Sequence, residues 1–323
     1  MGTLSAIMAL KITGRHYPDN VGRCDILFES LRHFGLTRLF SEFLIVVPAA
    51  EEARIRDYAR AWSDFPLQLV VEDDYLALFK KFSKLHQVRP WHRQQIIKLF
   101  CATLVANPYF LVVDPDILAV RGFSYDDVIP GGKALLQPES REVHRRWWVD
   151  SAEVLGVDPH LERIGMGVTP AILSREACQG LVEHIEKRHG RVWYEVLLSR
   201  YAVDWTEYTL YELYLELSGR LDEFHVWPED AARVQLHSTV NVWSDGDLDQ
   251  VDVRGLFGPE NPGLFAVIQS NSGVTPQRIA AALRPYLNVA VQNYERSNSV
   301  REKVRELYGA GVRKTMQLLR VRP

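Results

Sequence analysis

Short apolar runs alternate with segments of helical periodicity over the first third of the chain. The runs are rich in β-branched and aromatic residues, as buried strands are, and the segments between them place apolar side chains on one side of a helix. We expect strands at 6–12, 43–47, 67–71 and 109–113 and helices at 24–34, 51–62 and 90–106. This alternation predicts an α/β fold with a mostly parallel central sheet flanked by helices.

Beyond residue 130 the alternation is less regular. We expect short strands at 133–137, 224–227 and 233–236, an extended segment at 164–173, helices at 141–155, 175–189, 192–201 and 207–217, and a loop at 246–262. No internal repeat or low-complexity tract interrupts the sequence. The simplest organisation is a compact domain over residues 1–270 followed by a helical C-terminal extension over 271–323.

The composition narrows the class of protein. A chain of 323 residues with 47% hydrophobic side chains can bury a sizeable core. Its net charge of -3 gives no broad basic field, which argues against binding to nucleic acid. Cys24, Cys101 and Cys178 are far apart and have no metal-ligand spacing, which indicates a reducing compartment. No apolar run reaches the roughly 20 residues of a spanning helix, so we expect a cytoplasmic protein.

The segment 301–323 combines many basic residues with apolar ones at near-helical intervals, and its only acids are Glu302 and Glu306. Such a pattern is compatible with a basic amphipathic helix lying on the anionic inner face of a membrane. It is also typical of an ordinary helix that packs on the domain with its basic side in water. The sequence slightly favours the packed helix, and peripheral membrane contact stays open.

Asp114-Pro115-Asp116 directly follows the apolar run at 109–113. Pro115 has no N–H for a ladder, so regular strand pairing should stop there. Two acids separated by one residue on extended chain can point toward the same place. At the rim of a sheet that place suits a divalent cation, although a polar turn explains the same residues.

The helix expected at 90–106 carries an arginine within its apolar stripe. At about 100° per residue, Arg93 falls on the stripe and Gln94 at its edge. A cation at the positive end of a helix needs an anionic partner, which a bound phosphate or an acidic side chain would supply. The helix leads directly into the strand before Asp114, so both can border one pocket.

Glu207 opens a later helix and shares a face with Tyr211 and Tyr214. A carboxylate among aromatic rings is desolvated, which raises its pKa toward that of a general base. The alternative is a reciprocal cap, with Asp204 as the N-cap and Glu207 at the third helical position. The sequence leaves the two interpretations even.

Three further residues are candidates for ligand contacts. His237 follows a short strand and has a ring nitrogen that a metal can take, although lone histidines are more often structural. Gly167, in a Gly-x-Gly run, allows close approach of a ligand to the backbone. Gln269 lies in a polar cluster after the apolar run 264–268, where it would either donate to a sugar hydroxyl or form a turn.

These motifs together resemble a known family. Trp-His-Arg-Gln-Gln at 91–95, the Asp-x-Asp at 114–116 and Thr-Glu-Tyr at 206–208 are similar to a bacterial family of glycosyltransferase-like proteins of unknown function. That family is similar to nucleotide-sugar glycosyltransferases of the GT-A fold. The resemblance covers about residues 5–275. It implies a GT-A-like, Rossmann-like sheet.

The resemblance also implies a metal-dependent glycosyltransferase. Such an enzyme moves a sugar from a nucleotide-sugar donor, here expected to be a UDP-sugar, to a hydroxyl of a glycan, glycolipid or natural product. Asp114 and Asp116 would hold Mn²⁺ or Mg²⁺ on the donor diphosphate, and His237 is the candidate third ligand. Glu207 would be the base in an inverting reaction, with Asp204 as its competitor.

The donor would be held by residues from several segments. We expect these contacts from Arg93, Gln94, Lys98, Gly167 and Gln269, together with Asp114. Trp147, Trp148 and Trp205 are candidates for stacking on sugar rings, although aromatic residues are more often core.

Two other classes of function remain open. A nucleotidyltransferase acting on a sugar phosphate also uses paired acids and a metal, but no glycine-rich basic loop follows the first strand. A non-catalytic glycan-binding protein would bind sugar without a metal.

Overall fold

A five-stranded sheet, in the order β3-β2-β1-β4-β9, lies at the centre of the computed structural model, which describes residues 2–14, 17, 19–75, 90–200, 203–231 and 234–299. Its strands are β1 (Leu4–Ala9), β2 (Phe40–Val47), β3 (Leu67–Val71), β4 (Tyr109–Val112) and β9 (Ala171–Ser174). The first four are parallel, and β9 pairs antiparallel with β4. The predicted α/β class with a mostly parallel sheet is confirmed.

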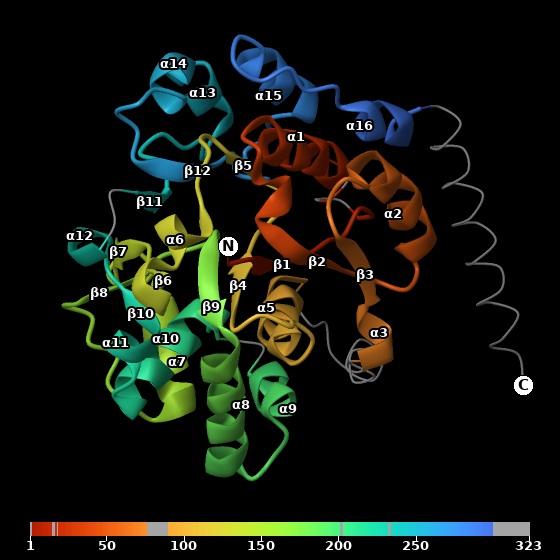
Figure 1. Cartoon of the computed structure of the whole chain (residues 1–323). Helices are drawn as coiled ribbons and strands as arrows, with labels where there is room; N and C mark the ends of the chain where they lie inside the picture. The colour runs from red at the N-terminus through yellow and green to blue at the C-terminus, as the bar shows by residue number, and fades with distance from the viewer. Residues whose placement is uncertain are drawn as a thin grey trace, which may run out of the picture.

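Helices cover both faces of this sheet (Figure 1). On one side lie α1 (Asn20–His33) and α2 (Glu52–Tyr58), and on the other lie α5 (Pro90–Phe100) and α8 (Arg175–His189). Phe28 of α1 is fully buried and packs on Phe43 of β2 and on Trp62, with ring centroids 5.1 and 4.7 Å away. The apolar stripes predicted from helical spacing therefore form the core.

The expected elements of the first half are present with shifted ends. The first strand starts at Leu4 and ends at Ala9, earlier than the expected 6–12. The helix expected at 90–106 ends at Phe100 and continues as a 3-10 turn, η3 (Cys101–Thr103). The last ladder bond of β4 runs from the Val113 N–H to the Ile7 oxygen, 3.0 Å, so pairing stops before Pro115 as predicted.

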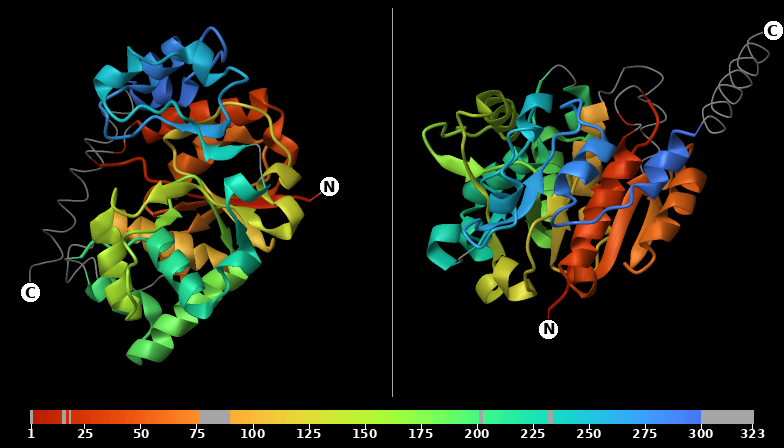
Figure 2. Two further views of the ribbon diagram at one scale, coloured as in Figure 1. Left: turned by 90° about the vertical axis from the view of Figure 1, so that its left-hand side faces the viewer. Right: turned by 90° about the horizontal axis from the view of Figure 1, so that it is seen from above.

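The strand expected at 233–236 is present, shifted to 235–237, and belongs to a second sheet that was not expected. A three-stranded sheet joins β11 (Gln235–His237), β12 (Gly263–Val267) and β5 (Ile117–Ala119), and β5 directly follows Asp116. The prediction of a loop at 246–262 was wrong in part, because two short helices, α13 (Asp245–Leu248) and α14 (Val253–Leu256), lie there. Each of them buries a leucine in a second apolar cluster. Figures 1 and 2 show this part at the opposite end of the molecule from α8.

The extended segment expected at 164–173 is two strands, β8 (Ile164–Met166) and β9, on either side of a cis Thr169–Pro170 bond. The remaining elements are η1 (Leu36–Arg38), η2 (Ala59–Trp62), α3 (Glu72–Tyr75), α6 (Tyr125–Val128), η4 (Pro130–Gly132), β6 (Ala134–Leu135), β7 (Pro138–Ser140), α7 (Arg145–Leu155), α9 (Trp193–Ser199), α10 (Glu207–Ser218), α11 (Leu221–Phe224), β10 (His225–Val226) and α12 (Pro228–Ala231).

Two helices of the predicted C-terminal extension pack on α1. These are α15 (Pro276–Leu283) and α16 (Gln292–Ser297). The buried Asp25 of α1 accepts hydrogen bonds from the Asn293 N–H and amide, at 3.0 and 2.7 Å. The division at residue 270 stays a prediction, and the basic segment 301–323 lies outside the described residues. Within the described residues, none of the helices has the length and apolar character needed to span a bilayer.

Candidate functional site

The carboxyl ends of β1 and β4 meet at the point where the strand order changes direction. From β1 the chain proceeds outward through β2 and β3 on one side, while β4 lies on the other side of β1. Ligands of open parallel sheets bind at such a switch point. Asp114 and Asp116 follow β4 there, as the sequence predicted.

Asp114 belongs to a buried polar network around Lys98. The Lys98 ammonium lies 3.1 Å from Asp114 Oδ2 and 3.1 Å from Glu207 Oε1. It also contacts the hydroxyl of Thr169 at 3.2 Å, and that hydroxyl is 2.7 Å from the Tyr208 hydroxyl. One ammonium thus joins the end of β4, the start of α10 and the segment before β9.

Burial makes the charges of this network depend on each other. Lys98 is 4% exposed and Glu207 is fully buried. Although burial lowers the pKa of Lys98, the carboxylates of Asp114 and Glu207 raise it well above its usual value. Burial raises the pKa of Glu207, and Lys98 opposes that rise. The second oxygen of Asp114, Oδ1, is buried without a hydrogen-bond partner among the described residues.

Glu207 is bound at both of its oxygens. Lys98 holds Oε1, and Gln95 donates to the same carboxylate when its amide is oriented to satisfy its neighbours. In that orientation the Gln95 oxygen accepts from Trp91 Nε1 at 3.1 Å. Glu207 is therefore desolvated and raised in pKa as predicted, and side chains of α5 contact both of its oxygens.

The alternative cap at the start of α10 is wrong. Thr206 is the N-cap and accepts from the Thr209 N–H, so Glu207 is the first helical residue. Asp204 precedes this cap, and its carboxylate pairs with the exposed Arg146 at 3.4 Å. The structure does not bring Asp204 to the Lys98 network, because this ion pair and a bond from its N–H to Asp150 hold it at α7.

Asp116 faces the loop that follows β12. Its Oδ2 accepts from the Ser270 N–H at 2.9 Å, and its backbone oxygen accepts from the Ile268 N–H at 2.8 Å. Burial raises the pKa of Asp116, and the charge of Asp114 raises it further. Gln269 lies in a turn: its side-chain oxygen accepts from the Ser270 N–H, and its backbone oxygen accepts from the Ser272 N–H. Its contact with a sugar hydroxyl stays a prediction.

His237 and Gly167 lie beside each other but not in one metal site. The His237 ring nitrogen Nε2 is 3.0 Å from the Val168 oxygen, and burial lowers the pKa of the ring. A Cβ on Gly167 would lie 3.3 Å from Gln137, so one side of this glycine is already packed. Across the described ranges, three or more His, Cys, Asp or Glu side chains nowhere converge to hold an ion. The expected trio of Asp114, Asp116 and His237 is not assembled.

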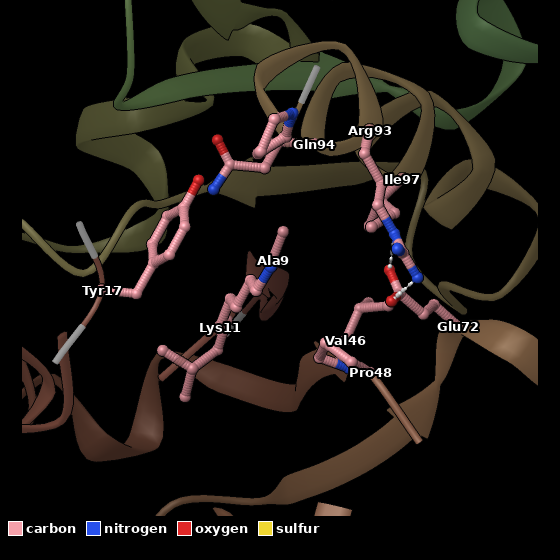
Figure 3. A pocket seen from close by; sticks show the side chains of 11 residues that line it. Ala9, Lys11, Tyr17, Val46, Pro48, Glu72, Arg93, Gln94 and Ile97 are labelled. Carbon is pink, nitrogen blue, oxygen red and sulfur yellow. Dashed lines mark hydrogen bonds and ion pairs between the residues drawn. The ribbon is translucent and has the colours of Figure 1, made fainter. Parts of the chain in front are cut away.

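A pocket lies at the ends of β1, β2 and β3, against the start of α5 (Figure 3). It encloses about 540 Å³, its open mouth included. Its lining comprises Ala9, Leu10, Lys11, Tyr17, Val46, Pro48, Glu72, Pro90, Arg93, Gln94 and Ile97. Arg93 pairs with Glu72 through two hydrogen bonds, so the anionic partner that its position required is an acidic side chain. Figure 3 shows Tyr17 and Gln94 with their polar ends toward each other across the opening.

Several residues of the site were not expected. Lys11 and Tyr17 line the pocket, with the Lys11 ammonium 5.2 Å from the centre of the Tyr17 ring. Their position shortly after the first strand is the one feature of the sequence that could have indicated a place at the pocket. Thr169 and Tyr208 complete the Lys98 network, and no periodicity would have placed them there.

Two carboxylates at this site fit a divalent ion that shares its ligands with a substrate. Mg²⁺ is commonly held by one or two protein carboxylates, several waters and substrate phosphates rather than by a complete protein cage. A cation would satisfy the buried, unbonded Oδ1 of Asp114 and would oppose both the burial and the charge of Asp114 that raise the pKa of Asp116. The set of oxygens suits Mg²⁺ or Mn²⁺.

Fold and site define an α/β protein with paired carboxylates and a ligand pocket at the switch point of its sheet. Over residues 1–291 the sequence matches the family described as "Family of unknown function (DUF6492)", and the chain belongs to that family. A comparison with curated protein sequences gives no match.

The solved structures to which this chain is similar include three glycosyltransferases. Mouse xyloside xylosyltransferase 1, in its apo form, has 15% identity and a TM-score of 0.45, covering 84% of this chain and 99% of its own. The galactosyltransferase LgtC with donor and acceptor sugar analogues has 9% identity, a TM-score of 0.47 and coverages of 90% and 99%. Core-mannan synthase A from Aspergillus fumigatus, in its Mn/GDP form, has 12% identity, a TM-score of 0.43 and coverages of 71% and 74%. These similarities are remote, so the function is argued from this chain's own residues.

Proposed function

We propose that this protein is a metal-dependent glycosyltransferase that moves a sugar from a nucleotide-sugar donor to a hydroxyl acceptor. The observation that carries the proposal is the pair Asp114 and Asp116 at the switch point, with one buried carboxylate oxygen of Asp114 unbonded. A divalent cation would satisfy both carboxylates, and the pocket at the ends of β1, β2 and β3 offers room for a ligand that brings further oxygens.

The pocket suits the nucleoside end of the donor. Tyr17 offers an aromatic face, Gln94 offers an amide, and Lys11 adds a positive charge for phosphate. The charge of Arg93 is balanced by Glu72, so Arg93 shapes the wall more than it attracts the diphosphate. The pocket and Asp114 lie beyond the ends of neighbouring strands, which lets one donor span both.

The residues around the metal site have distinct roles in this proposal. When bound, Mn²⁺ or Mg²⁺ would act as a Lewis acid that offsets charge on the departing nucleoside diphosphate, with Asp114 and Asp116 as its protein ligands. Lys98 fixes the orientation of the Asp114 carboxylate through Oδ2 and leaves Oδ1 available. Glu207, bound at both oxygens, holds Lys98 in place and therefore acts as a positioning residue rather than as the acceptor's base.

The proposal is tested by measuring how a panel of nucleotide sugars changes the thermal stability of the protein, with and without Mn²⁺. A donor at a hundredfold excess over its dissociation constant stabilises the fold by about 2.7 kcal/mol. We expect one donor, with UDP-sugars the first candidates, to stabilise the protein only when the metal is present and to release a nucleoside diphosphate on turnover. Release of pyrophosphate would instead indicate a nucleotidyltransferase, and sugar binding without any metal effect a glycan-binding protein.

A further inference from the structure

A second candidate site lies on the other side of α5 from the nucleotide pocket. At about 100° per residue, Trp91, Gln95 and Lys98 share one side of this helix, while Arg93 and Ile97 point to the other. Arg93 and Ile97 line the nucleotide pocket. Gln95 and Lys98 contact Glu207, so the opposite side of α5 faces the start of α10.

An aromatic wall continues from this second side. The ring of Trp91 lies 5.7 Å from that of Trp147, and Trp147 stacks on His144 with ring centroids 3.7 Å apart and planes at 11°. All three rings are half-buried. Of the aromatic residues proposed for sugar stacking, Trp148 and Trp205 are buried in the core, which leaves Trp147.

Glu139 of β7 adds a carboxylate to this wall. Its side chain is 30% exposed, and burial raises its pKa. His144 Nε2 lies 3.6 Å from its oxygen, too far for a good hydrogen bond, and burial lowers the pKa of His144, which favours the neutral ring. In the described part of the chain, no hydrogen bond to the Glu139 carboxylate is found. The carboxylate is thus partly open to solvent and has no protein donor, so a ligand that brings hydroxyl groups can donate to it.

Two short paths connect this wall to Asp114. On one path, Trp91 binds Gln95, Gln95 binds Glu207, and Lys98 joins Glu207 to Asp114. On the other path, β7 pairs with β8, and β8 leads through Gly167 to Thr169, which contacts Lys98. The wall is therefore linked to Asp114 through side chains of α5 and α10, on the side of α5 opposite Arg93 and Ile97.

We propose that Glu139, His144 and Trp147 form the acceptor subsite, and that its occupant is a pyranoside whose hydroxyl donates to Glu139 while its apolar face packs on the aromatic wall. This inference rests on the proposed glycosyl transfer for its role, but not for the binding itself. A flat ring with hydroxyls at its edge and C–H groups on its face matches both parts of the site. A lipid chain would leave Glu139 without donors.

Saturation-transfer NMR without donor or metal tests the binding directly. The probes are methyl α- and β-pyranosides of glucose, galactose, mannose and xylose. We expect at least one to bind the wild-type protein, and Glu139→Gln, which keeps the shape of the side chain, to weaken that binding by about tenfold or more. Trp147→Leu should do the same. Trp243→Leu is the control, because Trp243 is 49% exposed and belongs to the segment between β11 and β12.

The outcomes separate the subsite from the proposed function. No pyranoside binding to the wild type, or equal binding by Glu139→Gln, would overturn the subsite. Metal-dependent donor hydrolysis by the wild type, with pyranoside binding kept in Trp243→Leu and lost in Glu139→Gln, supports both proposals. Glu139-dependent pyranoside binding without turnover of any donor would leave the subsite standing and reject the transferase.

Discussion

Replacing Lys98 by methionine removes the single ammonium that balances two carboxylates in the core of the site. Methionine has a similar length and no charge, so the change tests electrostatics more than packing. The variant leaves Glu207 fully buried and facing Asp114 without a counter-charge. Gln95 still donates to Glu207, but a neutral amide does not replace the charge.

The expected loss of stability follows from the two distances that join the Lys98 ammonium to the carboxylates of Asp114 and Glu207. Unit charges 3.1 Å apart attract by about 5 kcal/mol at an effective dielectric constant of about 20. The desolvation of Lys98, which the variant avoids, offsets part of the two attractions. Removing one partner of a buried pair generally costs about 3–5 kcal/mol, and we expect Lys98→Met to lower the free energy of unfolding by that amount.

The pH dependence of the loss has a defined sign. Without Lys98 the pKa of folded Glu207 rises further above its unfolded value, so the folded variant holds a proton that the unfolded chain releases. The loss in the free energy of unfolding is therefore absent at a pH below the pKa of Glu207 in the unfolded chain. It grows as the pH rises from there through the pKa of Glu207 in the folded variant. Urea unfolding of Lys98→Met and wild type at pH 5 and pH 8 should show the larger gap at pH 8.

A double variant provides the control. Lys98→Met with Glu207→Gln has no buried unpaired charge at this position, and we expect it to recover about 2 kcal/mol or more relative to Lys98→Met alone. Two results would refute the reasoning: a single variant within about 1 kcal/mol of wild type, or a double variant as unstable as the single one.

Three further predictions follow from the site and the core. Asp116→Asn keeps an oxygen for the Ser270 N–H but loses the charge, so the protein should stay folded while release of nucleoside diphosphate falls at least about 100-fold; unchanged turnover would speak against a metal at this site. Glu207→Gln should lower turnover, keep donor binding and retain the acidic limb of the kcat profile, whereas loss of that limb would make Glu207 the base after all. His225 is buried, with a pKa lowered to about 4, and the Tyr211 hydroxyl contacts its ring. In the unfolded chain His225 takes up a proton from about pH 6.5, whereas the folded ring stays neutral until about pH 4. The free energy of unfolding of the wild type should therefore fall by about 3 kcal/mol between pH 6.5 and 4. Urea unfolding of His225→Gln over the same pH range should lack this fall.

The first half of the fold could be predicted because strands and helices there have strong, separate periodicities. The short strands expected at 133–137, 224–227 and 233–236 are present as β6, β10 and β11. The strand β5 could not be predicted, since it has three residues and pairs with β12 from far along the chain. Asp114 was found by its place after an apolar strand. The role of Glu207 as the acceptor's base stays a prediction. Its desolvation is readable from neighbouring aromatic residues, but the partners of its oxygens come from α5, and spacing along the sequence does not show which helices meet.

Calorimetric titration of nucleoside diphosphates into wild type and Asp116→Asn, with Mn²⁺ or with a chelator, tests the metal-anchored donor most directly. The account predicts that one nucleoside diphosphate binds wild type in Mn²⁺, that the chelator abolishes this binding, and that Asp116→Asn loses it while remaining folded. The account would be contradicted if the nucleoside diphosphate bound wild type equally well with the chelator in place of Mn²⁺, or if it bound the folded Asp116→Asn variant as tightly as wild type.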